Sequence, residues 1–523
     1  MESLLEEPRV VTDSLGGSPL ARLAAQGGEH ASEWYLRRPR NPNEWRERAI
    51  TVRADVDGEW ARRLAPAFVQ GAEAARRLNR VVAENGIVVT TGQQPGLFGG
   101  PIYTTAKALS ALALSDAIES ATGIPAAPVF WAATDDADFF EAASTVVVID
   151  GAAQELRIPR DAQSDGNPLY AVPLPKVDAL IARLEEASGS SPDARPISLV
   201  RQSYRNGATI GSAFVELLAE LLGPLGITIL DAGHPAVRVA AHSLMCKALT
   251  VAQDLDRAIA VRDQALRRAG HTPQVETLAD RSLVFEVRGT KARVPMERAR
   301  AVAQAAKPGE LAPNVLLRPV VERSLLPTVG YLAGPGELAY FAQTTAVAEA
   351  LGAPVPLAVP RWSLTIVEPH VERIVNEFGL ALSDLAELHN VEAKLAREVV
   401  PEAVAAELRA LRGAIDERLA ELRGEVESAP SVPLRSEAIE GARRALQLRV
   451  DRLERRVLAA AKHTDRERRR RVAAAAASLY PLNKRQERAA NLIPFLARYG
   501  SRLFDTMRSE AAKYAERLVF GQP

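Results

Sequence analysis

The chain has 523 residues, more than one ordinary hydrophobic core accommodates, so about two to four structural units are expected. Lys and Arg together number 65, and so do Asp and Glu together. This balance of charge argues against bulk attraction to nucleic acid or an anionic membrane. The single cysteine, Cys246, excludes an intrachain disulfide and a multi-cysteine zinc site. This low cysteine content fits a protein of the reducing cytosol. We recognise neither a signal peptide nor an apolar run long enough to span a membrane, so the expected location is cytoplasmic.

Strands and helices alternate through the first two thirds of the chain. After amphipathic helices in residues 1–80, a buried strand at 86–91, a helix at 102–120 and a strand at 125–133 predict a βαβ unit with parallel strands. The pattern predicts an α/β fold with a doubly wound parallel sheet. Further strands are expected at 144–150, near the end of 211–235, at 326–334 and at 353–361, with insertions at about 151–210 and 270–310.

The pattern changes after residue 366, where apolar residues recur in steps of three and four. Two such runs are separated by a proline-containing reversal at 428–434, which predicts an antiparallel coiled-coil hairpin. An exposed apolar seam usually requires a partner, and a second copy of the chain is the commonest one, although the hairpin could pack only on itself. The seam positions are Leu408, Leu411, Ile415, Leu419, Leu422 and Val426, followed by Ile439, Ala442, Leu446, Val450, Leu453 and Val457.

A glycine-rich loop, TTGQQPGLFGGP at 90–101, follows the first strand of the βαβ unit. In doubly wound sheets ligands bind at the carboxyl ends of the strands, where glycines let the backbone approach them closely. The loop matches neither a Walker motif nor a dinucleotide fingerprint, and a turn that is merely long is the alternative. The N-terminus of the next helix also attracts anions. The candidate ligand-binding residues here are Gly92, Gln93, Gln94, Gly96, Tyr103 and Lys107.

Three aspartates follow the second strand, in TDDADFFEAA at 134–143. Asp135, Asp136 and Asp138 are close enough to repel one another, so such a cluster usually shares a proton, a substrate ammonium group or a Mg²⁺ ion. One of them could also act as a general base. Capping of the helix that begins near FFEAA is the alternative, which explains one aspartate better than three.

A third polar set lies in the stretch 313–343 and at the end of the strand that follows it. Gly334, Pro335 and Gly336 open a helix whose backbone amides form a second candidate anion site. Arg361 could clamp a carboxylate or phosphate, although an exposed arginine is the usual interpretation of such a residue. The candidate binding residues are Asn314, Arg318, Glu322, Gly334, Gly336, Glu337, Tyr340 and Arg361.

The histidines and the basic run at 466–471 carry weaker signals. The seven histidines show no metal-ligand spacing, so we predict no metal site built from protein ligands alone. His234 and His271 lie near strand-linked turns and are candidate site members. RERRRR at 466–471 is interpreted as a solvated helix face rather than a nucleic-acid patch, because the chain has no net charge.

Four long motifs resemble the bacillithiol-biosynthesis cysteine-adding enzymes, the BshC family. They are, in order, TTGQQPGLFGGPIYTTAK, PVFWAATDDADF, NVLLRPVVERSLLPTVGYLAGPGELAYFAQ and LYPLNKRQER. The resemblance covers nearly the whole chain and implies a Rossmann-like core over 1–365, a dimerising coiled-coil domain over 366–475, and a C-terminal helical segment over 476–523 that returns to the core. It also implies the joining of cysteine to glucosaminyl malate. Members of this family typically have Glu-Asp-His-Asp-Phe where this chain has Asp135-Asp136-Ala137-Asp138-Phe139.

The favoured function is therefore a ligase that forms an amide between cysteine and an amino sugar. An amide does not form unaided from a carboxylate and an amine, so ATP is the expected activator, giving an adenylate or an acyl phosphate. Mg²⁺ could accompany it. A nucleotidyl-transfer or acyl-activating enzyme for another small molecule is a second hypothesis. A third hypothesis is a dimeric binding protein that lost catalysis together with the motif histidine, whose place is taken by Ala137.

Overall fold

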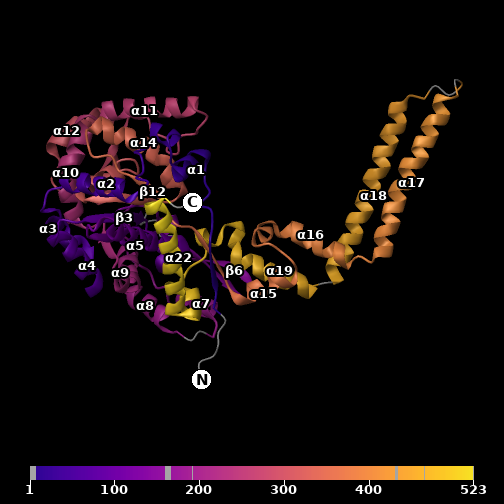
Figure 1. Cartoon of the computed structure of the whole chain (residues 1–523), viewed down its shortest axis with the longest axis horizontal. Coiled ribbons are helices and arrows are strands. Elements are labelled where there is room, and N and C mark those ends of the chain that lie inside the picture. Colours follow the sequence, from indigo (N-terminus) through magenta and orange to yellow (C-terminus); the bar gives the residue numbers. More distant parts are fainter. Residues whose placement is uncertain are drawn as a thin grey trace. The chain divides into compact units, whose positions relative to one another are not determined.

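The computed structural model describes residues 7–159, 166–190, 193–429, 431, 434–464 and 466–521. Two compact units are found in this part of the chain, and Figure 1 labels some of their elements. The first contains the described residues up to Ile149, then Gln154–Glu368 and the described residues from Lys484 onward. The second contains Asp150–Ala153 and Pro369–Asn483.

The first unit is built on a six-stranded sheet whose neighbouring strands are parallel, except for one antiparallel strand at the edge. The two central strands carry continuous apolar runs because they are buried on both faces. In spatial order the strands are β12 (Ala358–Pro360), β11 (Thr328–Ala333), β3 (Ile87–Gln93), β4 (Ala126–Ala132), β7 (Thr228–Asp231) and β2 (Phe68–Val69).

Helices cover both faces of this sheet, which confirms the doubly wound class. Val88 and Trp131 belong to the hydrophobic core on one face, whereas Ile87 and Phe130 belong to the core on the other, because side chains alternate along a strand. The first core includes residues of α1 (Pro19–Gln26), α3 (Trp60–Leu64), α4 (Ala72–Ala83), α10 (Pro235–Thr250), α11 (Ala252–Arg268), α13 (Arg318–Leu325) and α14 (Pro335–Leu351). The second includes residues of α2 (Pro42–Ala54), α5 (Ile102–Thr122), α9 (Ile210–Leu222) and α22 (Ser501–Phe520).

The strand expected at 144–150 forms, but it does not join the main sheet. This strand, β5 (Ser144–Ile149), pairs with β6 (Ala152–Arg157) in a separate two-stranded sheet. Both edges of β4 are already occupied, by β3 and by β7, so the parallel strand expected after β4 is supplied by β7 instead. The short helices that follow in the chain are α7 (Asp178–Ser188) and α8 (Arg195–Ser203).

A small antiparallel sheet forms within the expected insertion at 270–310, and one strand lies just beyond it. Its strand order is β10 (Leu311–Pro313), β8 (Arg281–Arg288) and β9 (Thr290–Pro295), accompanied by α12 (Ala299–Ala305). A second small sheet joins distant parts of the chain, because β1 (Arg9–Thr12) pairs antiparallel with β13 (Leu364–Val367).

The C-terminal segment packs on the first unit. It contains α20 (Gln486–Ala489), α21 (Ile493–Tyr499) and α22, and Leu503 and Met507 of α22 belong to the same buried core as Leu109 of α5. This segment contributes to the candidate site.

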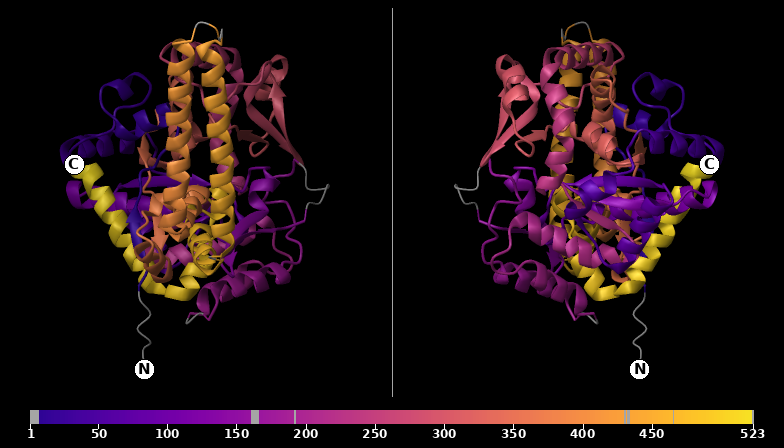
Figure 2. Two further views of the ribbon diagram at one scale, coloured as in Figure 1. Left: turned by 90° about the vertical axis from the view of Figure 1, so that its right-hand side faces the viewer. Right: turned by 90° about the vertical axis from the view of Figure 1, so that its left-hand side faces the viewer.

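The second unit is helical and contains the expected hairpin. Its long helices, α17 (Glu402–Glu427) and α18 (Ser436–Thr464), lie side by side in Figure 1 and in both views of Figure 2. Cross-pairs fix the antiparallel direction, since Arg412 pairs with Asp451 while Asp416, further along α17, pairs with Arg443, which precedes Asp451 on α18. The remaining helices are α15 (Pro369–Glu377), α16 (Leu388–Val399) and α19 (Arg466–Leu479).

The hairpin covers only part of its apolar seam. Ile439 and Val450 are buried, but four leucines of the predicted seam remain 41–47% exposed. These are Leu411, Leu422, Leu446 and Leu453. In the described part of the chain, no helix combines the length and the apolar character needed to cross a membrane.

Candidate active site

A cavity of about 680 Å³ lies in the first unit, at the carboxyl ends of β3, β4 and β11. Fourteen of the sequence-predicted site residues line it, from four segments that are far apart in the chain. Parallel strands end at the same edge of the sheet, so the segments that follow them converge. These lining residues are Gly92, Gln93, Gln94, Tyr103, Lys107, Asp135, Asp136, Asn314, Arg318, Gly334, Gly336, Glu337, Tyr340 and Arg361.

The loop after β3 has a backbone that requires its glycines. Phe98, Gly99 and Gly100 have φ angles of 53°, 87° and 76°, and for Phe98 this left-handed conformation costs about 1–2 kcal/mol. The Phe98 ring packs edge-on against Tyr204, with ring centroids 5.0 Å apart, and this contact helps to hold the strained residue. At Gly92, a Cβ atom would lie 3.1 Å from the Arg318 guanidinium, so this glycine lets an arginine pack directly against the strand.

Lys107 is buried at the centre of the polar network. Its Nζ donates to the Gly92 carbonyl at 2.7 Å and to Gln93 Oε1 at 3.0 Å, and pairs with Glu337 Oε2 at 2.6 Å. An ammonium group has three N–H donors, and all three are used here. Lys107 therefore joins the β3 loop to the N-terminus of α14 and is a structural tie within the site.

Glu337 is the carboxylate that this network surrounds. Its Oε2 accepts from the Gly334 amide at 2.7 Å, and its Oε1 accepts from the Tyr331 hydroxyl at 2.7 Å. Burial alone would raise the pKa of Glu337, but the charges of Lys107 and Arg318 outweigh burial and hold the pKa below its usual value. Glu337 is therefore a fixed negative charge.

Arg318 completes this side of the cavity. Its Nη2 donates to the Tyr340 hydroxyl at 3.0 Å, and both Nη atoms lie 3.4 Å from the Tyr331 hydroxyl. Its nearest carboxylate oxygen, on Glu337, is 3.9 Å away. Burial alone would lower the pKa of Arg318, but the two tyrosines and Glu337 outweigh burial and raise it well above its usual value. The arginine therefore keeps its charge.

Two of the three aspartates after β4 face the cavity. Asp136 Oδ2 accepts from Gln94 Nε2 at 2.7 Å, while its Oδ1 accepts from the Ala137 amide at 2.6 Å. Asp135 pairs with Lys291 of β9, with 3.4 Å between Oδ2 and Nζ. The acidic loop is thus tied to the glycine-rich loop on one side and to the β8–β9 insertion on the other.

Three predicted site residues do not line the cavity. Asp138 is exposed and caps α6 (Phe139–Ala142) through the Glu141 amide, so helix capping explains this aspartate. Gly96 packs against Gly100 inside the loop, and its carbonyl accepts from the Tyr204 hydroxyl at 3.2 Å. Glu322 lies one helical turn beyond Arg318 on α13, but it is fully buried and accepts from the Thr328 hydroxyl instead of lining the cavity.

The two candidate histidines also lie elsewhere. His234 caps α10, since its Nδ1 accepts from the Ala236 amide at 3.2 Å. His271 lines a different hollow, together with Trp34. No histidine is found among the described residues that line the main cavity.

Sequence reasoning missed several lining residues. Lys291 and Arg293 come from β9, where their spacing of two places both on one face, and Phe285 of β8 packs beneath them. The spacing of two residues between these cations on a predicted strand could have been recognised in the sequence. Arg488 comes from the C-terminal segment, within the motif LYPLNKRQER. Only the fold brings this motif to the cavity.

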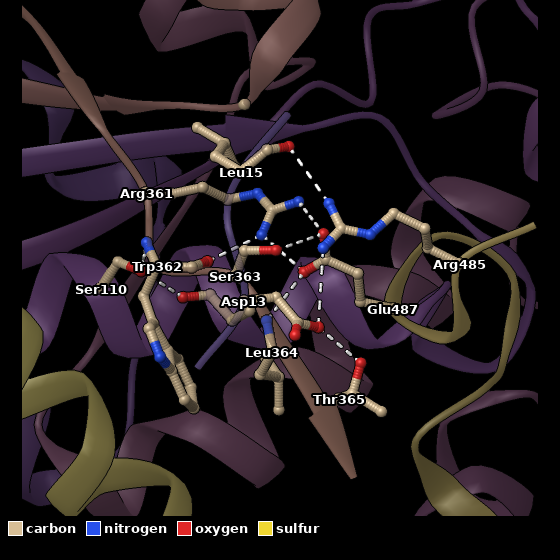
Figure 3. Close-up of polar contacts among 12 residues, drawn as sticks. Asp13, Leu15, Ser110, Arg361, Trp362, Ser363, Leu364, Thr365, Arg485 and Glu487 are labelled. Carbon is tan, nitrogen blue, oxygen red and sulfur yellow. Dashed lines mark hydrogen bonds and ion pairs between the residues drawn. The ribbon is translucent and has the colours of Figure 1, made fainter. Parts of the chain in front are cut away.

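Arg361 lines the cavity but is already engaged, as Figure 3 shows. Its Nη1 and Nη2 donate to the two carboxylate oxygens of Glu487 at 2.7 and 2.9 Å, and Nη1 also donates to the Trp362 carbonyl. The side chains of this pair are 1% and 2% exposed. Arg361 also lies over the ring of Tyr103, at 5.7 Å from its centroid. Its role is to support the wall of the cavity.

The site therefore presents both signs of charge to a ligand. On the acidic side, Asp136 carries a carboxylate that is hydrogen-bonded but has no ion-pair partner among the described residues. Arg293 and Arg488 line the cavity and form no ion pair with a described carboxylate, although burial raises the pKa of Glu141 and the charge of Arg488 acts to lower it. A zwitterionic or mixed-charge small molecule fits this arrangement.

Comparison with known proteins agrees with this architecture. Residues 18–362 match the family model for the N-terminal Rossmann-like domain of BshC of bacillithiol biosynthesis, and residues 364–517 match that for its C-terminal coiled-coil domain.

Three similar proteins carry the name "Putative cysteine ligase BshC". Those of Solibacter usitatus and Koribacter versatilis are both 31% identical to this chain, over 84% and 82% of it and 86% and 83% of their own lengths. That of Heliobacterium modesticaldum is 30% identical, over 86% of each chain. With both domains matched in order over nearly its whole length, the chain belongs to the BshC family of bacillithiol biosynthesis.

Proposed function

We propose that the protein is an ATP-dependent carbon–nitrogen ligase of the cytoplasm, which joins the carboxyl group of cysteine to the amine of glucosaminyl malate. Family membership supports the reaction class, since the relatives bear the name of cysteine ligases. The site supports the substrate class, because cysteine is a zwitterion and the acceptor carries both an amine and carboxylates. Both substrates need carboxylates and cations in one cavity.

The observation that carries this proposal is that one cavity at the strand ends holds both the Asp136 carboxylate, which has no ion-pair partner among the described residues, and buried positive charge. Asp136 is held by Gln94 and by backbone amides, with its carboxylate against the cavity. In the proposed reaction it binds an ammonium group or takes its proton. Arg318, with the Tyr340 hydroxyl beside it, supplies fixed positive charge in the same cavity. Backbone amides at the N-terminus of α14 favour negative charge there.

The proposed chemistry has two steps. A carboxylate oxygen of cysteine attacks a phosphorus atom of ATP, giving either an adenylate and pyrophosphate or an acyl phosphate and ADP. The acceptor amine then attacks the activated carbonyl carbon, the C–O bond to phosphate breaks, and the amine proton passes to a carboxylate, for which Asp136 is our candidate. Mg²⁺ would arrive with the nucleotide phosphates and take one or two protein oxygens at most.

One observation favours a second candidate function. Ala137 lines the cavity at the position where the resemblance to the BshC family implies a histidine, and no imidazole from the described residues lines the cavity. A protein that binds the ligands but catalyses nothing would fit this feature. The two functions differ in turnover and need not differ in affinity.

The test is product formation by the purified protein from cysteine, ATP and glucosaminyl malate, followed by mass spectrometry. Ligation requires all three substrates and releases AMP or ADP in a 1:1 ratio to product. Exchange of labelled pyrophosphate or phosphate into ATP, with cysteine and then with other amino acids, identifies the activated acid and the intermediate. Tight ligand binding with no product and no exchange would favour the binding-protein function over the ligase function.

A further inference from the structure

The short segment Gln486–Asn491 is anchored firmly to one wall of the cavity. The Gln486 side chain accepts from the Ile366 amide at 2.8 Å and donates to the Ile366 carbonyl at 2.9 Å. Glu487 pairs with Arg361 and also accepts from the Ser363 hydroxyl at 2.9 Å (Figure 3). These contacts fix the beginning of the segment against the chain that follows β12.

The other end of the segment is anchored to the glycine-rich loop. Asn491 is buried, and its Nδ2 lies 3.0 Å from the Phe98 carbonyl and 3.3 Å from that of Gly100. The Ile102 amide donates to the Ala490 carbonyl at 2.9 Å. The segment therefore connects the strained loop after β3 with the segment after β12, and its backbone is fixed at both ends.

Arg488 lies between these anchors and lines the cavity. Most of the other cations there already have a carboxylate: Lys107 has Glu337, Lys291 has Asp135, and Arg361 has Glu487. Arg488 is exposed and has no ion pair with any described residue. Arg293 also has no ion pair with any described residue, and its guanidinium group packs over the ring of Phe285.

A neighbouring arginine shows that the position of Arg488 is specific. Arg485, three residues earlier, points to the N-terminal part of the chain, where it donates to the Ser14 carbonyl at 2.8 Å. Figure 3 shows its contacts with the Leu15 carbonyl, at 3.3 Å, and with Asp13, at 3.6 Å. It does not line the cavity. One arginine of the motif thus fastens the segment, while the other faces the site.

We infer that Arg488 is a substrate-binding residue that takes an oxyanion in the cavity, either a carboxylate of the acceptor or a phosphate of the nucleotide. The inference rests on the proposed function for the identity of these substrates. A guanidinium group offers two parallel N–H donors that match two oxygens of a carboxylate or phosphate. Because the backbone on both sides is anchored, little ordering of the main chain is required when the anion binds.

The kinetic test compares Arg488→Gln, Arg488→Lys and the control Arg485→Gln, each checked by thermal unfolding. We expect Arg488→Gln to raise one KM by about tenfold or more, as loss of a charged hydrogen bond does, with a smaller rise for Arg488→Lys. A rise in the KM of glucosaminyl malate would identify the acceptor carboxylate as the anion that Arg488 binds. A rise in the KM of ATP would identify the nucleotide phosphate instead. If both KM values stay within about twofold of those of Arg485→Gln, the inference is wrong.

A binding measurement separates this inference from the proposed function. Calorimetry with L-malate and with inorganic pyrophosphate requires no turnover, so it remains informative if wild-type protein forms no product. Weaker binding of either probe to Arg488→Gln, by about fivefold or more relative to Arg485→Gln, supports the inference. Equal affinities, or no binding of either probe to the wild-type protein, overturns it.

Discussion

The cavity of the first unit and the helical hairpin of the second use ion pairs in opposite ways. In the first, Lys107 and Glu337 form an ion pair with side-chain exposures of 4% and 15%, and each makes further hydrogen bonds. In the hairpin, the pair between Arg443 and Glu440 has exposures of 40% and 44%. A buried pair has been removed from water and depends on its partners, whereas an exposed pair can exchange them for water. The difference implies that the buried ion pair fixes geometry in the cavity, whereas the exposed pair on the hairpin stays solvated.

The largest effect is expected from loss of the Asp136 carboxylate, which lines the cavity. Asp136→Asn keeps the shape of the side chain but cannot accept a proton or balance an ammonium charge. Turnover should fall by about 10²–10⁴-fold, the range for loss of a general acid–base group. Asp138→Asn is the matched control, because Asp138 is exposed and caps α6. Product formation measures both, and equal rates for the two variants would remove Asp136 from the mechanism.

The second effect tests the buried network directly. Lys107→Met leaves Glu337 buried without its main counter-charge, so the free energy of unfolding should fall by about 3–5 kcal/mol. The counterpart in the hairpin is Arg443→Met, which should change stability by no more than the error of the measurement. Urea unfolding followed by circular dichroism measures both variants. Similar losses in the two would contradict the contrast between the units.

The third effect concerns a buried carboxyl group outside the cavity. Burial raises the pKa of Glu322 from 4.5 to about 7, although Thr328 and Arg318 act in the opposite direction. Between these values the folded state keeps a proton that the unfolded state releases, so stability falls from about pH 4.5 to about pH 7 and then levels off. Glu322→Gln removes this contribution and should stabilise the protein at pH 8 by about 3 kcal/mol. Denaturant unfolding from pH 4.5 to pH 8 provides the test, and identical pH slopes for the two proteins would refute it.

The fourth effect is a gain. Ala137 lines the cavity beside Asp136, and an imidazolium introduced there would be stabilised by the nearby carboxylates. Ala137→His should therefore fold and should raise ligase activity, by about tenfold if the imidazole serves as a proton shuttle. Ala137→Ser is the control for a polar side chain without an imidazole. A wild-type rate that falls in Ala137→His would mean that the site is built around a small residue.

The smallest effect on the first unit is expected from changes in the hairpin. We propose that the exposed leucines of the seam join two copies of the chain. Leu446→Glu should then shift the protein toward monomer in light scattering while leaving its thermal unfolding nearly unchanged. Leu448 on the same helix is 48% exposed but lies off the seam, so Leu448→Glu is the matched control. A wild-type monomer at micromolar concentration would refute the proposal.

Local sequence predicted the strands and the hairpin because each depends on short-range patterns. The β3 run is β-branched and bounded by glycine, and the steps of three and four in α17 and α18 need no knowledge of the rest of the chain. The sequence pattern could not show that β5 lies outside the main sheet. The position of β5 depends on which strand pairs with the second edge of β4, and that strand is β7. Likewise Glu322 and Arg318 are one helical turn apart in sequence, and only packing decided which of them lines the cavity.

The sequence by itself determined the doubly wound class, the antiparallel hairpin and the polar residues at the strand ends. Those residues converge because parallel strands end at one edge of a sheet, which is a property of the fold class. The tertiary structure alone decided the rest of the site. Lys291 comes from an insertion and Glu487 from the C-terminal segment, which lies 126 residues beyond its partner Arg361. No local pattern encodes such pairings, because they form only when distant parts of the chain bury their charges together.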